Sequence, residues 1–227
     1  MRTLAKWHIW LGWLVGVPIA MWLATGLFMV ARPIDEVRGN HLLREVPPAP
    51  LVIPGSTLAA PDANLKEMRV TMQDGRAVAT LTTLEDETRR VDFATGAALP
   101  ALDAAAARAL VAARIVGGDK AERVTLFPAD KIPFDFRRPL AVWQVQLADG
   151  TNVYVGRDTG EVEAVRTRWW RGFDLAWGLH IMDLSEREDT SHPVLIIFAA
   201  ISLTGALVGC VLMFRRRKAR PGVRPLR

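Results

Sequence analysis

Two histidines lie in one short polar segment, and imidazole is a common ligand of haem iron and of transition metals. The segment "WGLHIMDLSEREDTSHP" contains His180 and His192, two of the four histidines in the chain. It lies between an aromatic-rich stretch and a long apolar run. The two histidines are therefore either ligands or polar residues at the point where the chain enters a membrane.

The other two histidines belong to the N-terminal part of the chain. His8 lies in an apolar run near the start, and His41 lies ten residues beyond the end of that run. The candidates for haem binding are therefore His180, His192, His41 and His8. We expect His180 to be the best single ligand, because Trp177 and nearby apolar residues could shield a porphyrin. His41 or His192 would then be its partner, whereas a site at His8 would need a second copy of the chain.

A run of acids between the two histidines could hold a hard cation such as ferric iron. The acids are Asp183, Glu186, Glu188 and Asp189, and Arg187 lies among them. Acidic runs of this kind are more often solvated, so we expect no metal site. The chain also lacks GxSxG, HExxH, CxxC and Walker sequences, which argues against the enzyme classes that use them. No catalytic pair is visible.

Two uncharged segments predict membrane-spanning helices. Residues 7–31 contain His8 as their only ionisable side chain, and residues 193–214 contain no charged side chain. Each segment can cross a hydrocarbon layer of about 30 Å. The first is longer than the apolar run of a cleaved signal peptide, so we expect it to remain as an anchor. The single cysteine, Cys210, falls in the second span.

Charge then orients the chain. Residues 1–31 and 193–227 together hold nine basic side chains and no acid, whereas residues 32–192 hold 20 basic and 24 acidic side chains. Lysine and arginine beside membrane spans favour the cytoplasmic side. We expect a two-pass protein of a bacterial inner membrane, with cytoplasmic termini (residues 1–6 and the basic tail 215–227) and a periplasmic middle. The basic charges lie beside the bilayer, which argues against binding of nucleic acid.

The middle of the chain predicts an α+β domain. Residues 32–63 read as a proline-rich linker, and residues 64–166 as the domain. Asp74-Gly75 and Asp149-Gly150 each predict a two-residue hairpin turn. Between the hairpins, Asp103 is a plausible N-cap for an alanine-rich helix. We expect the buried face of this helix to contain the set Leu102, Ala106, Ala109, Leu110 and Ala113.

The two hairpins also resemble each other. The segment that begins at Ala77 aligns without gaps on the segment that begins at Ala141, at a constant offset of 64 residues. The alignment matches Thr95-Gly96 with Thr159-Gly160. The identities are few, but the constant offset favours two related strand units.

Two pairs of glycines predict close helix packing in the membrane. Gly12 and Gly16 lie in the first span, and Gly205 and Gly209 lie in the second. Glycines four residues apart share one helix face. Either the two spans pack on each other through these faces, or the chain forms a homodimer. Between the domain and the second span, residues 167–192 predict an aromatic helix on the membrane surface followed by an acidic loop.

The whole pattern resembles the PepSY domain and the PepSY-associated transmembrane proteins. The strand and turn "VYVGRDTGEV" is similar to the end of a PepSY domain, and Val155, Asp158, Thr159, Gly160 and Val162 carry that match. The resemblance implies a helix packed on an antiparallel sheet, set between two transmembrane helices. The flanks "HIWLG" and "LHIMDLSEREDTSHP" are similar to the first span and to the histidine-bearing approach of the transmembrane family.

The resemblance leaves two functions open. The first is a binding or regulatory module that uses no cofactor and acts on an unknown periplasmic or membrane protein, for example by restraining a protease. The second is a b-type haem component of an electron-transfer or ferric-siderophore reduction system, as in larger relatives. In those relatives Thr-Gly usually follows the approach histidine, whereas Ile181-Met182 follows His180 here.

The topology can be tested with a reporter enzyme that is active only in the periplasm. Fused after Arg227, the reporter should be silent, and inserted near Gly55 it should be active, because the basic residues beside both spans favour the cytoplasm. Activity of the C-terminal fusion would contradict the predicted arrangement.

Overall fold

The computed structural model describes residues 2–45, 50–51 and 64–217, apart from the side chains of Arg2 and residues 215–217. The chain divides into two compact units. Residues 34–171 form one, and residues 1–33 together with 172–227 form the other. Half of the predicted proline-rich linker (residues 46–49 and 52–63) and the tail beyond residue 217 lie outside the described residues.

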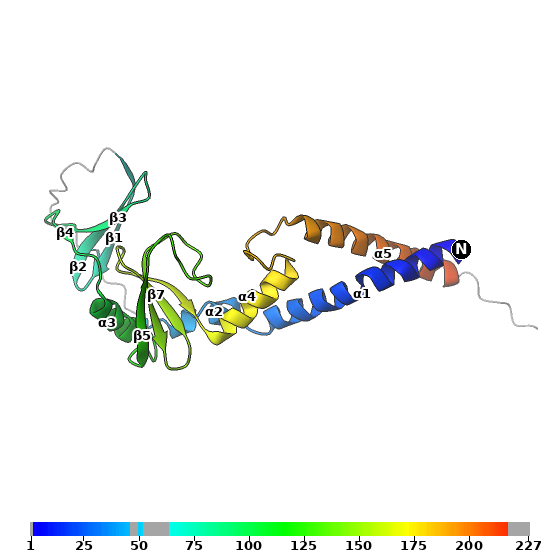
Figure 1. The fold of residues 1–227 in the computed structure, drawn as a ribbon, viewed down its shortest axis with the longest axis horizontal. Coiled ribbons are helices and arrows are strands. Elements are labelled where there is room, and N and C mark those ends of the chain that lie inside the picture. The colour runs from blue at the N-terminus through cyan, green and yellow to red at the C-terminus, as the bar shows by residue number, and fades with distance from the viewer. Residues whose placement is uncertain (1, 46–49, 52–63, 218–227) are drawn as a thin grey trace, which may run out of the picture. The chain divides into compact units, whose positions relative to one another are not determined.

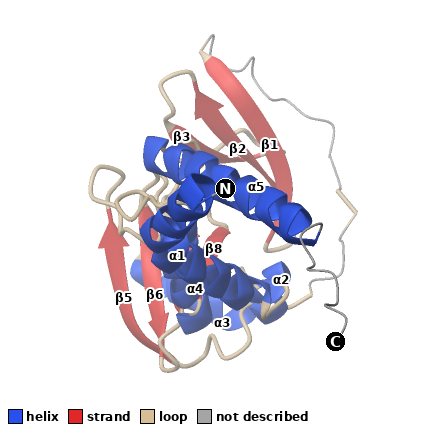
Figure 2. Ribbon diagram, turned by 90° about the vertical axis from the view of Figure 1, so that its right-hand side faces the viewer, coloured by secondary structure: helices blue, strands red, loops and turns tan. Residues whose placement is uncertain are grey.

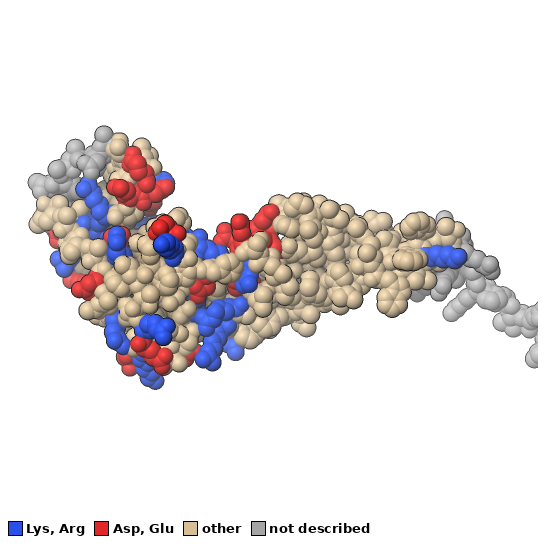
Figure 3. All heavy atoms as spheres, in the orientation of Figure 1, with Lys and Arg blue, Asp and Glu red and all other residues tan. Residues whose placement is uncertain are grey.

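Two long helices dominate the second unit, as the sequence predicts. They are α1 (Arg2–Val30) and α5 (Pro193–Arg217). The segments Thr3–Val30 and Pro193–Phe214 are long and apolar enough to cross a membrane. Figure 3 shows that they form a surface nearly free of charged side chains, whereas the charges gather on the rest of the chain. These helices support the assignment of a membrane protein.

The two long helices pack antiparallel through one of the two glycine pairs. A Cβ atom built on Gly209 would lie 2.8 Å from Cε1 of His8, and one on Gly205 would lie 3.9 Å from Cβ of Leu11. A side chain at position 209 would therefore require the His8 ring to move. In contrast, a Cβ on Gly12 or Gly16 would meet no atom within 4 Å. That pair instead faces a shallow groove away from α5.

A third helix, α4 (Arg168–His180), lies beside the C-terminal turns of α1. A Cβ atom on Gly172 would lie 3.3 Å from the ring of Phe28, and His180 stacks on Trp22. The residue order runs in opposite directions along the two helices, so α4 is antiparallel to α1, as Figure 1 shows for the yellow and blue ribbons. The predicted aromatic helix is present, and its position at the membrane surface remains a prediction.

The described residues of the other unit form eight strands in two antiparallel sheets, which Figure 2 draws in red. The first sheet has the order β1-β2-β3-β4 and the second β5-β6-β7-β8. The strands are β1 (Leu65–Gln73), β2 (Arg76–Thr83), β3 (Thr88–Asp92), β4 (Ala98–Leu99), β5 (Ala121–Phe127), β6 (Val142–Leu147), β7 (Asn152–Gly156) and β8 (Val162–Arg166). Both predicted hairpins form, with β1 and β2 joined at Asp74-Gly75 and β6 and β7 joined around Asp149-Gly150.

The two sheets confirm the internal repeat. Strand β7 has the same length as β3 and begins 64 residues after it, which is the offset found in the sequence. The ladder agrees as well: Ala79 pairs with Val91 in the first sheet, and Trp143 pairs with Val155 in the second. All five residue pairs between β2 and β3 recur between β6 and β7 at this offset. The two halves are therefore one strand pattern used twice.

One helix packs on the second sheet, and of the predicted set only Leu102 and Leu110 pack against its core. Helix α3 (Ala104–Arg114) begins at Asp103, whose carboxylate accepts the Ala106 amide at 2.7 Å. Its fully buried residues are Ala107 and Val111, which contact the core of the second sheet. The prediction that Ala106, Ala109 and Ala113 face the sheet was wrong, since all three are exposed. The buried face of α3 therefore follows Ala107 and Val111.

The second sheet is buried on both faces. On the face away from α3, Phe136 packs with Val142 and Tyr154 in a separate cluster. The Tyr154 hydroxyl donates to Asp135 and accepts from Gln144, and burial together with the Asp135 hydrogen bond raises the pKa of Tyr154. The alternation in β6 predicts that the face with Val142 and Gln144 is open to solvent. Residues between β5 and β6 cover that face instead.

The folded unit starts well before residue 64. Two short helices, α2 (Ile34–Val37) and η1 (Asn40–Leu42), lie within the predicted linker. Val37 is fully buried, and Leu43 forms a bridge with Ile115 after α3. Gly39 has φ of 77°, and a Cβ atom there would lie 2.7 Å from Cγ1 of Val165. The backbone of this segment at Gly39 thus packs closely against Val165 of the second sheet.

Replacement of Gly39 tests the close packing of this segment against Val165. Gly39→Ala should destabilise the folded protein by about 1–3 kcal/mol, because it adds both a strained backbone and a clash with Val165. Gly75→Ala is the matched control, since φ is 78° there but no atom lies within 4 Å of the added Cβ. The control should lose only about 1 kcal/mol. Urea unfolding in detergent micelles measures both, and equal losses would contradict the close approach.

Candidate functional site

His180 is the histidine with the most clearly defined surroundings. It ends α4, and its ring stacks on Trp22 of α1 with a centroid distance of 4.4 Å and an interplanar angle of 18°. Its Nδ1 lies 3.1 Å from Oγ1 of Thr25 and 3.2 Å from the carbonyl oxygen of Trp22. A Cβ atom on Gly26 would lie 3.3 Å from Cε1. Two adjacent turns of α1 therefore hold one edge of the imidazole ring.

The other three histidines lie in separate surroundings. His192 immediately precedes α5, where the Ile196 amide donates to its carbonyl oxygen at 3.2 Å and Pro193 is the first helical residue. This matches the predicted helix start. His8 lies against Gly209, and the exposed His41 belongs to η1 in the other unit. The Nδ1 atoms of His8 and His192 are buried with no hydrogen-bond partner within the part of the chain that the structure describes.

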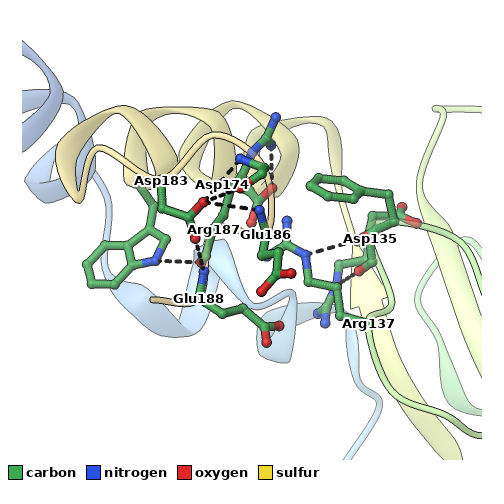
Figure 4. Close-up of polar contacts among 11 residues, drawn as sticks. Asp135, Arg137, Asp174, Asp183, Glu186, Arg187 and Glu188 are labelled. Atoms are coloured by element: carbon green, nitrogen blue, oxygen red, sulfur yellow. Dashed lines mark hydrogen bonds and ion pairs between the residues drawn. The ribbon is translucent and has the colours of Figure 1, made fainter. Parts of the chain in front are cut away.

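The acidic segment after His180 is organised around a single carboxylate. Asp183 is almost fully buried and accepts five hydrogen bonds, from the Ser185 hydroxyl at 2.7 Å and from four backbone amides. The amides belong to Ser185, Glu186, Glu188 and Asp189. Figure 4 shows the Asp183 side chain pointing into the loop that it closes. The loop is therefore a tight turn whose backbone amides surround the Asp183 carboxylate.

These bonds lower the pKa of Asp183. The largest cause is the hydrogen bond from the Ser185 hydroxyl, the amides of Glu186, Asp189 and Glu188 add to it, and burial opposes them. Because the folded state favours the ionised carboxylate, its contribution to stability is complete above the ordinary pKa of about 3.9. It is lost only when the pH falls through the lower pKa of the folded state.

A buried ion pair fastens the same loop to α4. Nη1 of Arg187 donates to Oδ2 of Asp174 at 2.6 Å, and both side chains are largely buried. The indole of Trp177 donates to the Arg187 carbonyl oxygen at 3.1 Å. Gly178 lies beneath this arginine, and a Cβ atom there would lie 2.7 Å from Cγ of Arg187. The loop and the last turns of α4 therefore form one rigid piece that ends in His180.

The acidic run is not a preformed cation site. Asp183 uses its oxygens on the loop itself, whereas Glu186, Glu188 and Asp189 are exposed. Across the described ranges, no group of three or more His, Cys, Asp or Glu side chains is placed to hold a metal ion.

A second candidate site lies in the α+β unit, between the two repeats. Its cavity of about 240 Å³ is lined by Glu67, Arg69, Thr80, Thr82, Thr88, Arg138, Leu140, Thr159, Glu161 and Glu163. Hydrogen bonds join the repeats at its margin. The Thr71 hydroxyl donates to Glu161 at 3.2 Å, and the Gln73 amide donates to the Thr159 carbonyl oxygen at 3.3 Å.

The carboxylates of this cleft differ in how they are neutralised. Glu163 accepts from the Thr159 hydroxyl at 2.6 Å and pairs with Arg138 at 3.0 Å. Glu67 pairs with Arg69 at 3.2 Å. Glu161 accepts the Thr71 hydroxyl and forms no ion pair among the residues that the structure covers. The cleft can therefore receive a group that carries hydrogen-bond donors or a positive charge.

Neither the partners of His180 nor this cleft could be recognised from the sequence. Thr25 lies 155 positions before His180, and the cleft residues come from both repeats. A polar residue facing inward from an apolar helix is the one signal that marks Thr25.

The Asp183 loop can be tested by replacing its central oxygen. Asp183→Asn should speed backbone amide exchange across residues 185–189 at neutral pH and lower the thermal midpoint. The reason is that an amide NH₂ would face the amides of Glu188 and Asp189 in place of an acceptor. Asp189→Asn is the control, because among the described residues the Asp189 carboxylate accepts only the Ser191 amide. Equal exchange in both variants, measured by mass spectrometry, would contradict the central role of Asp183.

Comparison with known proteins gives one match. No curated protein and no solved structure is significantly similar to the chain. A family model described as the PepSY-associated TM region matches residues 5–227. That match takes in both long helices, both sheets and the histidine-bearing loop. The chain therefore belongs to the family of proteins with a PepSY-associated transmembrane region.

Proposed function

We propose that the protein is a membrane-anchored binding module. Helices α1 and α5 would anchor it in a bacterial inner membrane, with both termini in the cytoplasm and the α+β unit in the periplasm. The distribution of charge supports this arrangement, since the basic residues without acids flank the two spans. The unit would act by binding a periplasmic or membrane protein, of which a protease is one candidate class.

The observation that carries this proposal is the polar cleft between the repeats. Hydroxyl, carboxylate and guanidinium groups line it, and the edge strand β1 supplies Glu67 and Arg69 to it. Such a surface suits a polypeptide with polar side chains better than an apolar small molecule, since ligand pockets are mostly apolar. Glu161, which forms no ion pair within the described residues, would bind a lysine or arginine of that partner.

Photo-crosslinking in cells tests the cleft. A photoreactive amino acid in place of Thr88, which lines the cleft, should give a discrete crosslinked product. The same amino acid in place of the exposed Glu122 on β5 is the control and should give none. Glu161→Gln should weaken the product from position 88, because it removes the charge that attracts the partner. A product that is insensitive to Glu161→Gln, or equal at both positions, would contradict the proposal.

A second function, binding of b-type haem, is favoured by one specific observation at His180. Its Nδ1 lies against α1, whereas Nε2 has no hydrogen-bond partner in the described part of the chain and is not buried. An imidazole nitrogen with a free lone pair is a common ligand of haem iron. His180 would hold the iron, and His192 or a histidine of a second copy would complete the site. Haem would supply one-electron transfer, as in ferric-siderophore reduction.

The two functions differ in a simple spectrum. Protein purified from haem-replete cells should show a stoichiometric b-type absorbance under the haem function, and His180→Ala should abolish it. Absence of that absorbance from the wild-type protein would leave the binding function as the sole proposal.

A further inference from the structure

The hydrogen bonds around His180 determine which ring nitrogen carries its proton. A backbone carbonyl oxygen can only accept a hydrogen bond, and a threonine hydroxyl has one hydrogen to donate. The Thr25 hydroxyl lies 2.9 Å from the Trp22 carbonyl oxygen and donates to it. Toward His180, the oxygen of this hydroxyl can therefore only accept a hydrogen bond.

Nδ1 of His180 consequently faces two acceptors. These are Oγ1 of Thr25 at 3.1 Å and the carbonyl oxygen of Trp22 at 3.2 Å. A lone pair on Nδ1 would be repelled by both oxygens, whereas a hydrogen on Nδ1 would bond to both. The other arrangement, with Thr25 donating to Nδ1, would break the Thr25–Trp22 bond and still leave the carbonyl oxygen facing a lone pair.

The ring has little freedom to escape this choice. Trp22 covers one of its faces, and Gly26 approaches its Cε1 closely enough that a Cβ atom there would lie at 3.3 Å. The backbone of α4 is fixed by the Asp174–Arg187 ion pair and the Trp177 hydrogen bond. Rotation of the imidazole by half a turn would place a carbon atom against the two oxygens and forfeit the bonds.

We infer that Thr25 is a positioning residue that fixes His180 as the Nδ1–H tautomer and thereby presents the Nε2 lone pair as a ligand for haem iron. The haem part of this inference rests on the second function proposed above, whereas the tautomer does not. A hydrogen bond to the distal ring nitrogen orients a ligating histidine and raises its basicity. Thr25 performs that task from an apolar helix, in which its own side chain is almost fully buried.

The tautomer can be measured directly by nitrogen NMR. The full-length protein, labelled with ¹⁵N at histidine and held in detergent micelles at a pH where its histidines are neutral, should show hydrogen on Nδ1 of His180. The signals are assigned by their absence from His180→Ala. Thr25→Ser should retain the tautomer, and Thr25→Val, which removes the hydroxyl at nearly constant volume, should shift the population toward Nε2–H. A wild-type spectrum with hydrogen on Nε2 would overturn the inference.

Haemin titration of the same samples tests the ligand assignment separately. Thr25→Val should bind haemin about 10- to 100-fold more weakly than Thr25→Ser, the range typical for loss of a hydrogen bond to a ligating histidine. The Soret absorbance gives the affinity, and far-UV circular dichroism checks that both variants are folded. Equal affinities would overturn the positioning role. If haemin fails to bind the wild-type protein, the haem assignment falls, whereas the NMR result alone decides the tautomer.

Discussion

The buried carboxylate of Asp183 is the constraint on which the histidine-bearing region depends. Five hydrogen bonds converge on it from the next six residues. The chain must therefore turn sharply between α4 and α5, and Met182 and Arg187 adopt positive φ angles of 58° and 60° to allow it. This cost is offset by the charge-assisted bonds. With the turn fixed, Arg187 reaches Asp174, α4 is held in place, and the ring of His180 lies on Trp22.

The parts of the fold that could be predicted from sequence are those governed by neighbouring residues. Asp103 marked the start of α3, and Asp74-Gly75 marked a hairpin, because caps and tight turns depend on a few adjacent positions. The repeat was visible for the same reason, as one strand pattern recurs at a constant offset. Uncharged length alone located both long helices. The PepSY resemblance, carried by the strand and turn around Thr159-Gly160, agreed with the family match.

What could not be predicted depends on distant contacts. The alanine-rich sequence of α3 offered several similar faces, and only contact with the second sheet selects Ala107 and Val111. The acidic run looked solvated because no local rule shows that Asp183 turns inward while its neighbours stay exposed. The pairing of Thr25 with His180 joins opposite ends of the chain. In each case the missing information was which surface a residue would meet.

The edge position of β1 has a consequence for solubility. A nine-residue strand with one unpaired side in its sheet can pair with the same strand of another molecule and begin a fibril. Strand β1 carries Lys66, Glu67 and Arg69 at consecutive or alternate positions, and the last two are more than half exposed. Any intermolecular ladder at this edge would need to desolvate those charges. These charges, of which those of Glu67 and Arg69 also border the cleft, thus protect the α+β unit against self-association.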